Sequence, residues 1–298
     1  MPSRGVVVPD LDGARALVTG ATSGVGLEIA RVLAAHGAHI VLPARSRAKG
    51  ESAIAAIRET APAARIELRD LDLVSLASVR EFANGLVAEG LPLDLLVLNA
   101  GIARVGDRTR EVTEDGFELH FQTNFLGHAL LVLSLLPLLR SSHARIAVQG
   151  SIVSALYGVS WDDPQFTRRY SALRAYASSK SALALFALEL ARRAPEVRVD
   201  LCHPGVVPAT AIAPEIRARV APAIHDFAVG RLWNPPAQAA EPALLALTTD
   251  VPGPAFCAPG GLLQVSGPAR VRPAFRRLSD LDGSRRIWDL AQKLATTA

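Results

Sequence analysis

The chain has 298 residues, of which 50% are hydrophobic and 20% charged, as expected of a globular protein with a large core. Its formal net charge is +4, but the arginines are scattered and no basic stripe contains interleaved aromatic residues, which argues against nucleic-acid binding. The two cysteines, Cys202 and Cys257, have no CxxC spacing and no histidine cluster nearby, so we expect neither a disulfide framework nor a metal site.

The termini and the longest apolar stretch bear on cellular location. Residues 1–13 carry charged side chains and lack the apolar core of a signal peptide. Residues 129–139 form an apolar run that is too short to span a bilayer and contains Pro137, so we predict a buried helix there. We therefore expect a cytoplasmic protein that does not bind membranes.

Up to about residue 205, short apolar segments alternate with longer segments of helical period. This alternation predicts crossover connections and therefore an α/β fold with a doubly wound parallel sheet of the Rossmann type. The strands are apolar throughout, which is typical of a sheet covered by helices on both faces. The predicted strands are 14–19, 38–44, 66–69, 93–98, 144–150 and 197–202, and the predicted helices are 20–35, 47–60, 75–88, 115–139 and 170–193.

The pattern changes after Pro204. Residues 206–236 are rich in proline and predict a lid over a substrate rather than a second domain. A helix near 237–248 and a strand near 262–265 are expected to complete the sheet, followed by a C-terminal tail at 266–298. We find no repeats or linkers, so we predict a single domain over residues 1–298.

The sequence TGATSGVG at 19–26 follows the first predicted strand and opens a helix. Gly20 allows a tight turn, Gly24 lets the backbone approach a phosphate, and Gly26 permits close contact between helix and strand. The helix N-terminus offers free N–H groups to a pyrophosphate. Three nearby glycines often mark only a turn, but this position between strand and helix predicts dinucleotide binding.

The end of the second predicted strand, residues 43–47, contains no carboxylate. NAD sites usually place an acidic residue there, whereas NADP sites supply an arginine. Arg45 is suited to a charge-assisted hydrogen bond with a 2′-phosphate. An exposed arginine at a strand end is common, but together with the glycine loop it predicts NADP(H).

Several polar residues indicate one catalytic site. Tyr176 and Lys180 are four residues apart on a predicted helix and share one face, so that an ammonium group could lower the pKa of the phenol. Ser151 follows the strand at 144–150, and Asn124 lies in an apolar helix that leaves its amide in need of partners. Each residue alone fits a structural role, and their combination points to catalysis.

In its motifs and their order, the chain resembles the short-chain dehydrogenase/reductases over about residues 10–265. Within that family it is most similar to the retinol-dehydrogenase-like group, through residues 43–53, 113–128 and 168–180. The motifs are TGATSGVG at 19–26, Asp72-Leu73, Asn99-Ala100-Gly101, Asn124, Ser151, YASSK at 176–180 and Pro204-Gly205.

The resemblance implies a role for each catalytic residue. Tyr176 would be the general acid in reduction, Lys180 would hold the nicotinamide ribose and lower the tyrosine pKa, and Ser151 would polarise the substrate oxygen. Asn124 would hold a water that links Lys180 to solvent. The expected cofactor-binding residues are Gly20, Ser23, Gly24, Val25, Gly26, Arg45, Asp72, Leu73, Asn99, Ala100, Gly101, Tyr176, Lys180, Pro204, Gly205 and Val207. A homo-oligomer, formed through the helices at 115–139 and 170–193, is also implied.

Two departures from the family pattern stand out: residues 161–164 form an expected flap beside the site, and Ala209 replaces the usual threonine. We predict an NADP(H)-dependent oxidoreductase that interconverts a ketone or aldehyde and an alcohol. Apolar residues of the lid suggest a hydrophobic substrate, although they could simply pack the lid onto the domain. The alternatives are reduction of an activated carbon–carbon double bond and a nucleotide sensor without catalysis.

Overall fold

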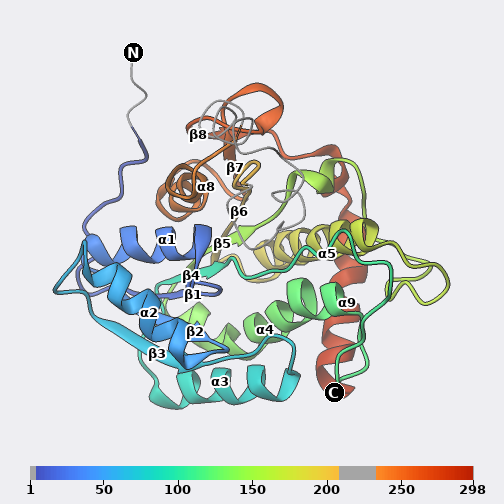
Figure 1. The fold of residues 1–298 in the computed structure, drawn as a ribbon, viewed down its shortest axis with the longest axis horizontal. Helices are drawn as coiled ribbons and strands as arrows, with labels where there is room; N and C mark the ends of the chain where they lie inside the picture. The colour runs from blue at the N-terminus through green and yellow to red at the C-terminus, as the bar shows by residue number, and fades with distance from the viewer. Residues whose placement is uncertain (1–4, 208–232, 298) are drawn as a thin grey trace.

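The computed structural model describes residues 5–207 and 233–297, so most of the predicted lid at 206–236 lies outside the described residues. The described strands form one eight-stranded sheet in the order β3-β2-β1-β4-β5-β6-β7-β8 (Figure 1). Neighbouring strands are parallel except β7 and β8, which are antiparallel. The strands are β1 (Arg15–Val18), β2 (His39–Ala44), β3 (Ile66–Asp70), β4 (Leu95–Leu98), β5 (Arg145–Gln149), β6 (Arg198–Cys202), β7 (Phe256–Pro259) and β8 (Ala269–Arg272).

This strand order confirms the predicted doubly wound α/β fold. The chain runs outward from β1 to β3, and β4 then returns to the other side of β1. The carboxyl ends of β1 and β4 therefore flank the point where the strand order reverses, which is where open α/β sheets bind ligands. The single-domain organisation stays a prediction, because residues 208–232 are not described.

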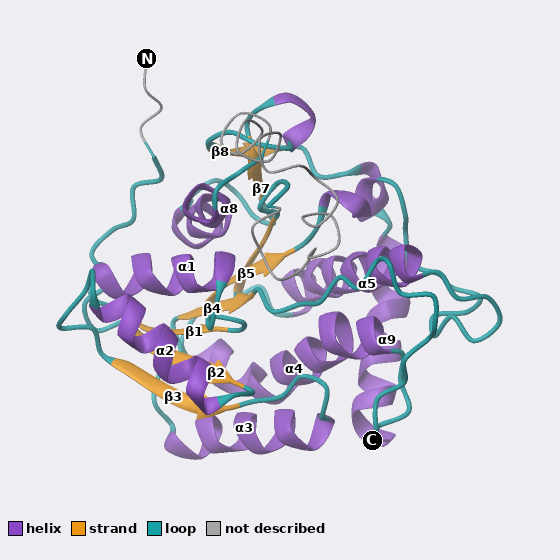
Figure 2. Cartoon of the chain, viewed as in Figure 1, coloured by secondary structure: helices purple, strands orange, loops and turns teal. Residues whose placement is uncertain are grey.

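Helices cover both faces of the sheet (Figure 2). One face carries α1 (Gly24–Ala35), α2 (Arg47–Arg58) and α8 (Pro236–Thr248). The other carries α3 (Leu76–Glu89), α4 (Gly127–Ser141) and α5 (Ala172–Arg193), with α9 (Leu281–Thr297) outside them. Four short turns complete the described structure: the π-helical η1 (Phe121–Leu126) and the 3₁₀ turns η2 (Ile152–Ala155), η3 (Leu262–Gln264) and η4 (Arg276–Ser279).

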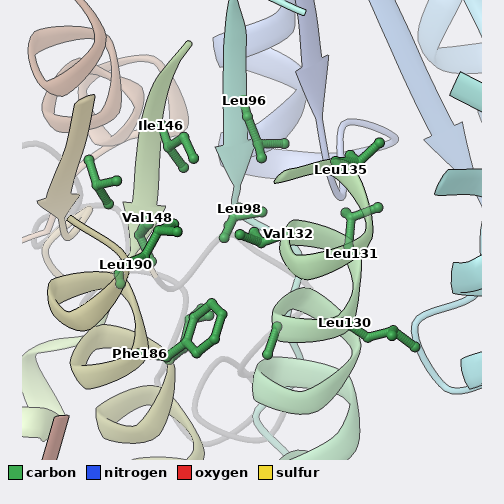
Figure 3. Packing of buried hydrophobic residues seen from close by; sticks show 14 of the residues in the cluster. Leu96, Leu98, Leu130, Leu131, Val132, Leu135, Ile146, Val148, Phe186 and Leu190 are labelled. Atoms are coloured by element: carbon green, nitrogen blue, oxygen red, sulfur yellow. The ribbon is translucent and has the colours of Figure 1, made fainter. Parts of the chain in front are cut away.

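The larger apolar core lies between the sheet and the helices α3, α4 and α5. Figure 3 shows side chains of β4 and β5, among them Leu96 and Val148, packed against Val132 of α4 and Phe186 of α5. The combined segment Phe121–Ser141 is long and apolar enough to cross a membrane, but 78% of its apolar 18-residue stretch is buried inside the protein. This burial confirms the prediction of a buried helix at 129–139.

The predicted strand at 262–265 is wrong. The chain there forms the turn η3, in which Leu263 and Gln264 have φ angles of 51° and 58°. A strand cannot contain such left-handed residues, so the sheet is completed by β7 before the turn and β8 after it. The antiparallel direction of β8 follows, because a short turn returns the chain alongside β7.

The predicted helix at 115–139 begins later than expected. Val112 and Glu118 form a β-bridge, and the Glu118 carboxylate then accepts a hydrogen bond from the Phe121 N–H at 2.7 Å. This carboxylate satisfies a backbone donor in the first helical turn. The helical segment starts at Leu119 and continues into the π-helical turn η1.

The C-terminal helix α9 packs on α5 and α4 (Figure 1). Trp288 stacks on Phe186 with ring centroids 5.0 Å apart, and the Arg193 guanidinium lies 5.1 Å from the centre of the Trp288 ring. Helix α9 thus covers part of α4 and α5, the two helices that were predicted to form contacts between subunits. The homo-oligomer stays a prediction, and the covered part of α4 and α5 is not available for it.

Candidate active site

The glycine loop after β1 packs directly on the loop after β4. Gly20 has a φ of +70°, and a Cβ added there would lie 2.9 Å from the Ala100 Cα. A Cβ on Gly26 would overlap the Asn99 side chain and the Gly20 carbonyl. These two positions therefore require glycine for the turn and for the close approach of the two loops.

The N-terminus of α1 has backbone donors available for an anion. Ser23 is the N-cap residue, but its side chain makes no capping hydrogen bond with any described residue, and the first turn contains no acidic side chain. Gly24 follows with a φ of +58°. The free N–H groups and the positive end of the helix dipole fit a pyrophosphate, as dinucleotide binding requires.

Arg45 is exposed at the end of β2, directly before Ser46, whose side chain caps α2 by accepting a hydrogen bond from the Lys49 N–H at 3.5 Å. The neighbouring strand β3 places an exposed carboxylate, Asp70, opposite Ala44. The sequence analysis did not place this carboxylate near the site. A carboxylate on the adjacent strand adds an acidic group to the region that contains Arg45.

Asp72 and Leu73 follow β3. The Asp72 side chain closes a local turn by accepting a hydrogen bond from the Val74 N–H at 3.0 Å, and the Asp72 N–H donates to the Ser78 hydroxyl at 3.0 Å. Leu73 is buried. The described contacts of both residues are structural, and their expected position at an adenine ring stays a prediction.

Ser151, Tyr176 and Lys180 come together where β5 ends beside α5. The Tyr176 hydroxyl donates to the Ser151 hydroxyl at 3.3 Å. Lys180 lies one helical turn further along α5, where its buried ammonium donates to the Gln149 carbonyl at 3.2 Å. Ser151 follows β5 and caps η2, since its hydroxyl accepts from the Val153 N–H at 3.5 Å. Two side chains from one helix thus meet a strand end that is distant in sequence.

Burial shifts the pKa values of both Tyr176 and Lys180. Burial raises the pKa of Tyr176, and the hydrogen bond with Ser151 opposes that rise. Burial lowers the pKa of Lys180 to about 8. The Lys180 ammonium is bonded to the Gln149 carbonyl and not to the phenol, and its expected effect on the tyrosine pKa stays a prediction. Tyr176 is protonated at neutral pH and is a proton donor.

Asn124 lies in η1 and is fully buried. Both polar atoms of its side-chain amide make hydrogen bonds. Its Oδ1 accepts from the Ile102 N–H at 2.8 Å, and its Nδ2 donates to the Ile102 carbonyl at 3.0 Å and to the Ser179 hydroxyl at 2.9 Å. A Cβ on Gly101 would lie 3.0 Å from the Lys180 Nζ and 3.1 Å from the Asn124 Oδ1. Glycine at 101 thus lets the lysine and the asparagine reach the loop after β4.

Thr19 joins the loops after β1 and β4. Its hydroxyl accepts hydrogen bonds from the N–H groups of Asn99 at 2.9 Å and Ala100 at 3.0 Å. The Asn99 side chain returns a hydrogen bond to the Thr19 carbonyl at 2.9 Å. The two segments expected to line the cofactor are therefore fastened to each other.

The loop after β6 is fixed by residues far along the chain. Gly205 has a φ of +79°, and the Val206 N–H donates to the Val265 carbonyl at 2.9 Å. The Asn234 side chain donates to the Pro204 carbonyl at 2.9 Å. Val207 packs, partly buried, against the core on the α1 and α8 side. Ala209 and Thr210, where the family pattern changes, lie outside the described residues.

The comparisons with known proteins agree with this geometry. A model of the short chain dehydrogenase family matches residues 14–221. The chain belongs to that family.

Two curated relatives of this short-chain dehydrogenase are a polyprenol dehydrogenase and a retinol dehydrogenase. Polyprenol dehydrogenase of Mus musculus is 44% identical over 210 residues, which are 67% of this chain and 62% of the relative. Retinol dehydrogenase 13 of Homo sapiens is 40% identical over 200 residues, which are 66% of this chain and 60% of the relative. The chain therefore matches somewhat less than two thirds of the length of these relatives.

Two solved structures share the fold of the short-chain dehydrogenase. A crystal structure of a protein from Mycobacterium paratuberculosis has a TM-score of 0.77 and 31% identity, covering 99% of this chain and 98% of that chain. A metagenomic short-chain oxidoreductase in complex with NADP has a TM-score of 0.59 and 26% identity, covering 82% and 95%. These findings confirm the resemblance to the short-chain dehydrogenase family. They also confirm that the protein is of the oxidoreductase class.

Two buried histidines, His120 and His128, were not predicted from the sequence to belong to the site. They lie four residues before and four residues after Asn124: His120 directly precedes η1 in the same helical segment, and His128 is in the first turn of α4. The signal was present as polar residues at helical spacing in an otherwise apolar run. Their partners were not predictable, because these partners come from the loops after β1 and β4.

The predicted flap at 161–164 is a turn that packs on the C-terminal helix. The Arg286 guanidinium lies 4.3 Å from the centre of the Trp161 ring. The preceding Ser160 N–H donates to the Ser178 hydroxyl of α5 at 3.1 Å, between Tyr176 and Lys180 in sequence. The turn is thus attached to the helix that carries the candidate catalytic residues.

Proposed function

We propose that this short-chain dehydrogenase is an NADP(H)-dependent enzyme that transfers a hydride between nicotinamide and a hydrophobic ketone, aldehyde or secondary alcohol. The observation that carries the proposal is the 3.3 Å contact between the hydroxyls of Tyr176 and Ser151, with Lys180 one turn away. A proton donor and a second hydroxyl at this spacing can both reach one substrate oxygen.

The protein's own residues handle the proton. When bound, the nicotinamide supplies the hydride for reduction or accepts it in oxidation. Tyr176, protonated because burial raises its pKa, donates a proton to the carbonyl oxygen, and the Ser151 hydroxyl polarises that oxygen by hydrogen bonding. In the oxidation direction the steps reverse: the Tyr176 phenolate, which is the form left after this donation, accepts the proton of the alcohol.

The residues around the switch point fit a dinucleotide. The donors at the start of α1 would hold the pyrophosphate, and Gly101 leaves room for groups beside Lys180. Exposed Arg45 would pair with the 2′-phosphate, which supports NADP over NAD despite Asp70 on the adjacent strand. A solved relative of the same fold is in complex with NADP.

Two observations support a hydrophobic substrate. The curated relatives are named for polyprenol and retinol, which are apolar alcohols. In this chain Leu156 and Tyr157 follow η2, the turn that Ser151 caps, and Leu156 is 68% exposed. Apolar side chains on the surface a few residues after Ser151 suit an apolar ligand.

A substrate panel tests the proposal. Saturated ketones, aldehydes and alcohols of increasing chain length are assayed with NADPH or NADP by the absorbance of NADPH, beside enones. We expect turnover of saturated long-chain carbonyl compounds or alcohols. Turnover of enones alone, with the carbonyl retained in the product, would indicate reduction of the double bond. NADPH binding without turnover of any compound would indicate a nucleotide sensor.

A further inference from the structure

Three buried polar side chains form a row along the helical segment that runs from the residue before η1 to the start of α4. His120, Asn124 and His128 are four residues apart, and their exposed fractions are 1%, 0% and 0%. Residues at this spacing lie on one face of a helix. Buried polar groups need partners, and each of these three finds them in the loops at the carboxyl ends of β1 and β4.

His128 reaches the loop through Thr19. Its Nδ1 lies 3.1 Å from the Asn124 carbonyl, which can only accept, so Nδ1 carries the proton. Its Nε2 lies 3.0 Å from the Thr19 hydroxyl and must therefore be the acceptor in the neutral ring. Burial and, to a smaller extent, the charge of Lys180 lower the pKa of His128 to about 3 against the opposing effect of the hydrogen bond with the Asn124 carbonyl, so the ring is neutral at physiological pH.

Neutral His128 also completes the hydrogen bonding of Thr19. A hydroxyl has one proton and two lone pairs. The lone pairs of Thr19 accept from the N–H groups of Asn99 and Ala100, while His128 Nε2 competes with the Val97 carbonyl, at 3.1 Å, for the proton. A protonated His128 would bring a third donor to two lone pairs, which the hydroxyl cannot accommodate.

His120 holds the same loop further along. Its Nε2 accepts from the Arg104 N–H at 3.1 Å, and its Nδ1–H donates to the Glu118 carboxylate at 2.8 Å. Glu118 is fully buried and also accepts from the Tyr170 hydroxyl at 3.5 Å. The His120 ring lies edge-on to Tyr176, with centroids 6.2 Å apart at an angle of 66°. His120 therefore contacts both the loop and the candidate proton donor.

Together the three side chains fix the loop at alternate residues: His128 through Thr19 at Ala100, Asn124 at Ile102, and His120 at Arg104. We propose that His120 and His128 are positioning residues, which as neutral hydrogen-bond acceptors hold residues 99–104 in the conformation that presents this loop to the dinucleotide. Only the identity of the ligand rests on the proposed function, because the hydrogen bonds exist in the protein alone.

Amide hydrogen exchange of the full chain without cofactor tests the positioning directly. We expect His128→Phe to speed exchange at Asn99 and Ala100 about tenfold, and His120→Phe to do so at Arg104, which corresponds to the loss of about one hydrogen bond. The matched control is Thr123→Val on the same turn, because the buried Thr123 hydroxyl has no hydrogen-bond partner among the described residues. Exchange at 99–104 should not change in this control.

NADPH affinity, measured by fluorescence titration, provides the second readout. His128→Phe should weaken binding about tenfold, and His128→Gln should recover most of it, because the amide oxygen still accepts from the Thr19 hydroxyl. If His128→Phe does not fold, Thr19→Val removes the same contact from the other side and should give the same acceleration of exchange.

Two outcomes would overturn the proposal: unchanged exchange at 99–104 in both histidine variants, or equal acceleration in Thr123→Val. A wild-type protein that binds no NADPH would instead contradict the proposed function, while the exchange experiment would still decide the role of the histidines.

Discussion

Two parts of the site are built in opposite ways. The loops after β1 and β4 are held by buried groups, in which Thr19, Asn124 and Lys180 each have polar partners inside the protein. The end of β2 carries Arg45 exposed to solvent. Buried, bonded groups set geometry and protonation, whereas an exposed charge selects a ligand without altering the fold. Substitutions in the first part should therefore change the reaction or the stability, and substitutions in the second only the choice of cofactor.

The largest effect is expected at Tyr176. Tyr176→Phe keeps the ring against His120 but removes the proton, so kcat should fall about a hundredfold to ten-thousandfold while cofactor affinity is retained. Steady-state kinetics with NADPH and the best carbonyl substrate measure it. Tyr170→Phe is the matched control, because its hydroxyl contacts Glu118 and not Ser151. Retention of most of the turnover in Tyr176→Phe would contradict the proposed mechanism.

A smaller effect is expected at the exposed end of β2. Arg45→Ala should lower kcat/KM for NADP about tenfold to hundredfold, the equivalent of roughly 1.5–3 kcal/mol, and leave NAD nearly unchanged. Arg45→Asp should reverse the preference by repelling the phosphate. It is a better choice than an aspartate at Ala44, which is buried.

The control for this cofactor prediction is Arg47→Ala, because Arg47 is also exposed but pairs with Glu51 at 3.2 Å. The ratio of kcat/KM for the two cofactors should hardly change in this variant. A wild-type enzyme that prefers NAD would show that the basic residues at 45–47 are only a solvated strand end.

The smallest effect is a pH dependence of stability at His128. Its pKa is about 3 in the folded protein and 6.5 in the unfolded chain, so the unfolded state binds the proton first as the pH falls. Stability is therefore complete above pH 6.5 and is lost toward pH 3. Between pH 7 and pH 5 the loss from this one group is about 2 kcal/mol.

Denaturant unfolding of the wild type and of His128→Gln at the two pH values measures this contribution. The variant should lose about 2 kcal/mol less than the wild type between pH 7 and pH 5. Other buried histidines, such as His203, whose folded pKa is about 4, affect both proteins equally. An identical loss in both proteins would show that His128 is not kept neutral by the fold.

The sequence by itself determined the strands β1 to β6, the helices between them and the order of the motifs. These features are local, since an apolar run, a glycine turn or an i, i+4 pair is visible within a few residues. The sequence also predicted, as local features, that Ser151 lies at a strand end and that Tyr176 and Lys180 lie on a helix. Their meeting at one edge follows from the parallel sheet, in which the carboxyl ends of the strands lie together.

Only the tertiary structure decided what depends on contacts between distant residues. The turn at Leu262–Gln264 resembles a strand in its apolar residues, but its left-handed φ angles and the pairing of β7 with β8 exclude one. The pKa of Tyr176 depends on burial and on the hydrogen bond with Ser151. His128 meets Thr19 across 109 positions of sequence. Local patterns specify which elements form, whereas the protonation state and partner of a buried polar group are set by whatever the folded chain brings within hydrogen-bonding distance.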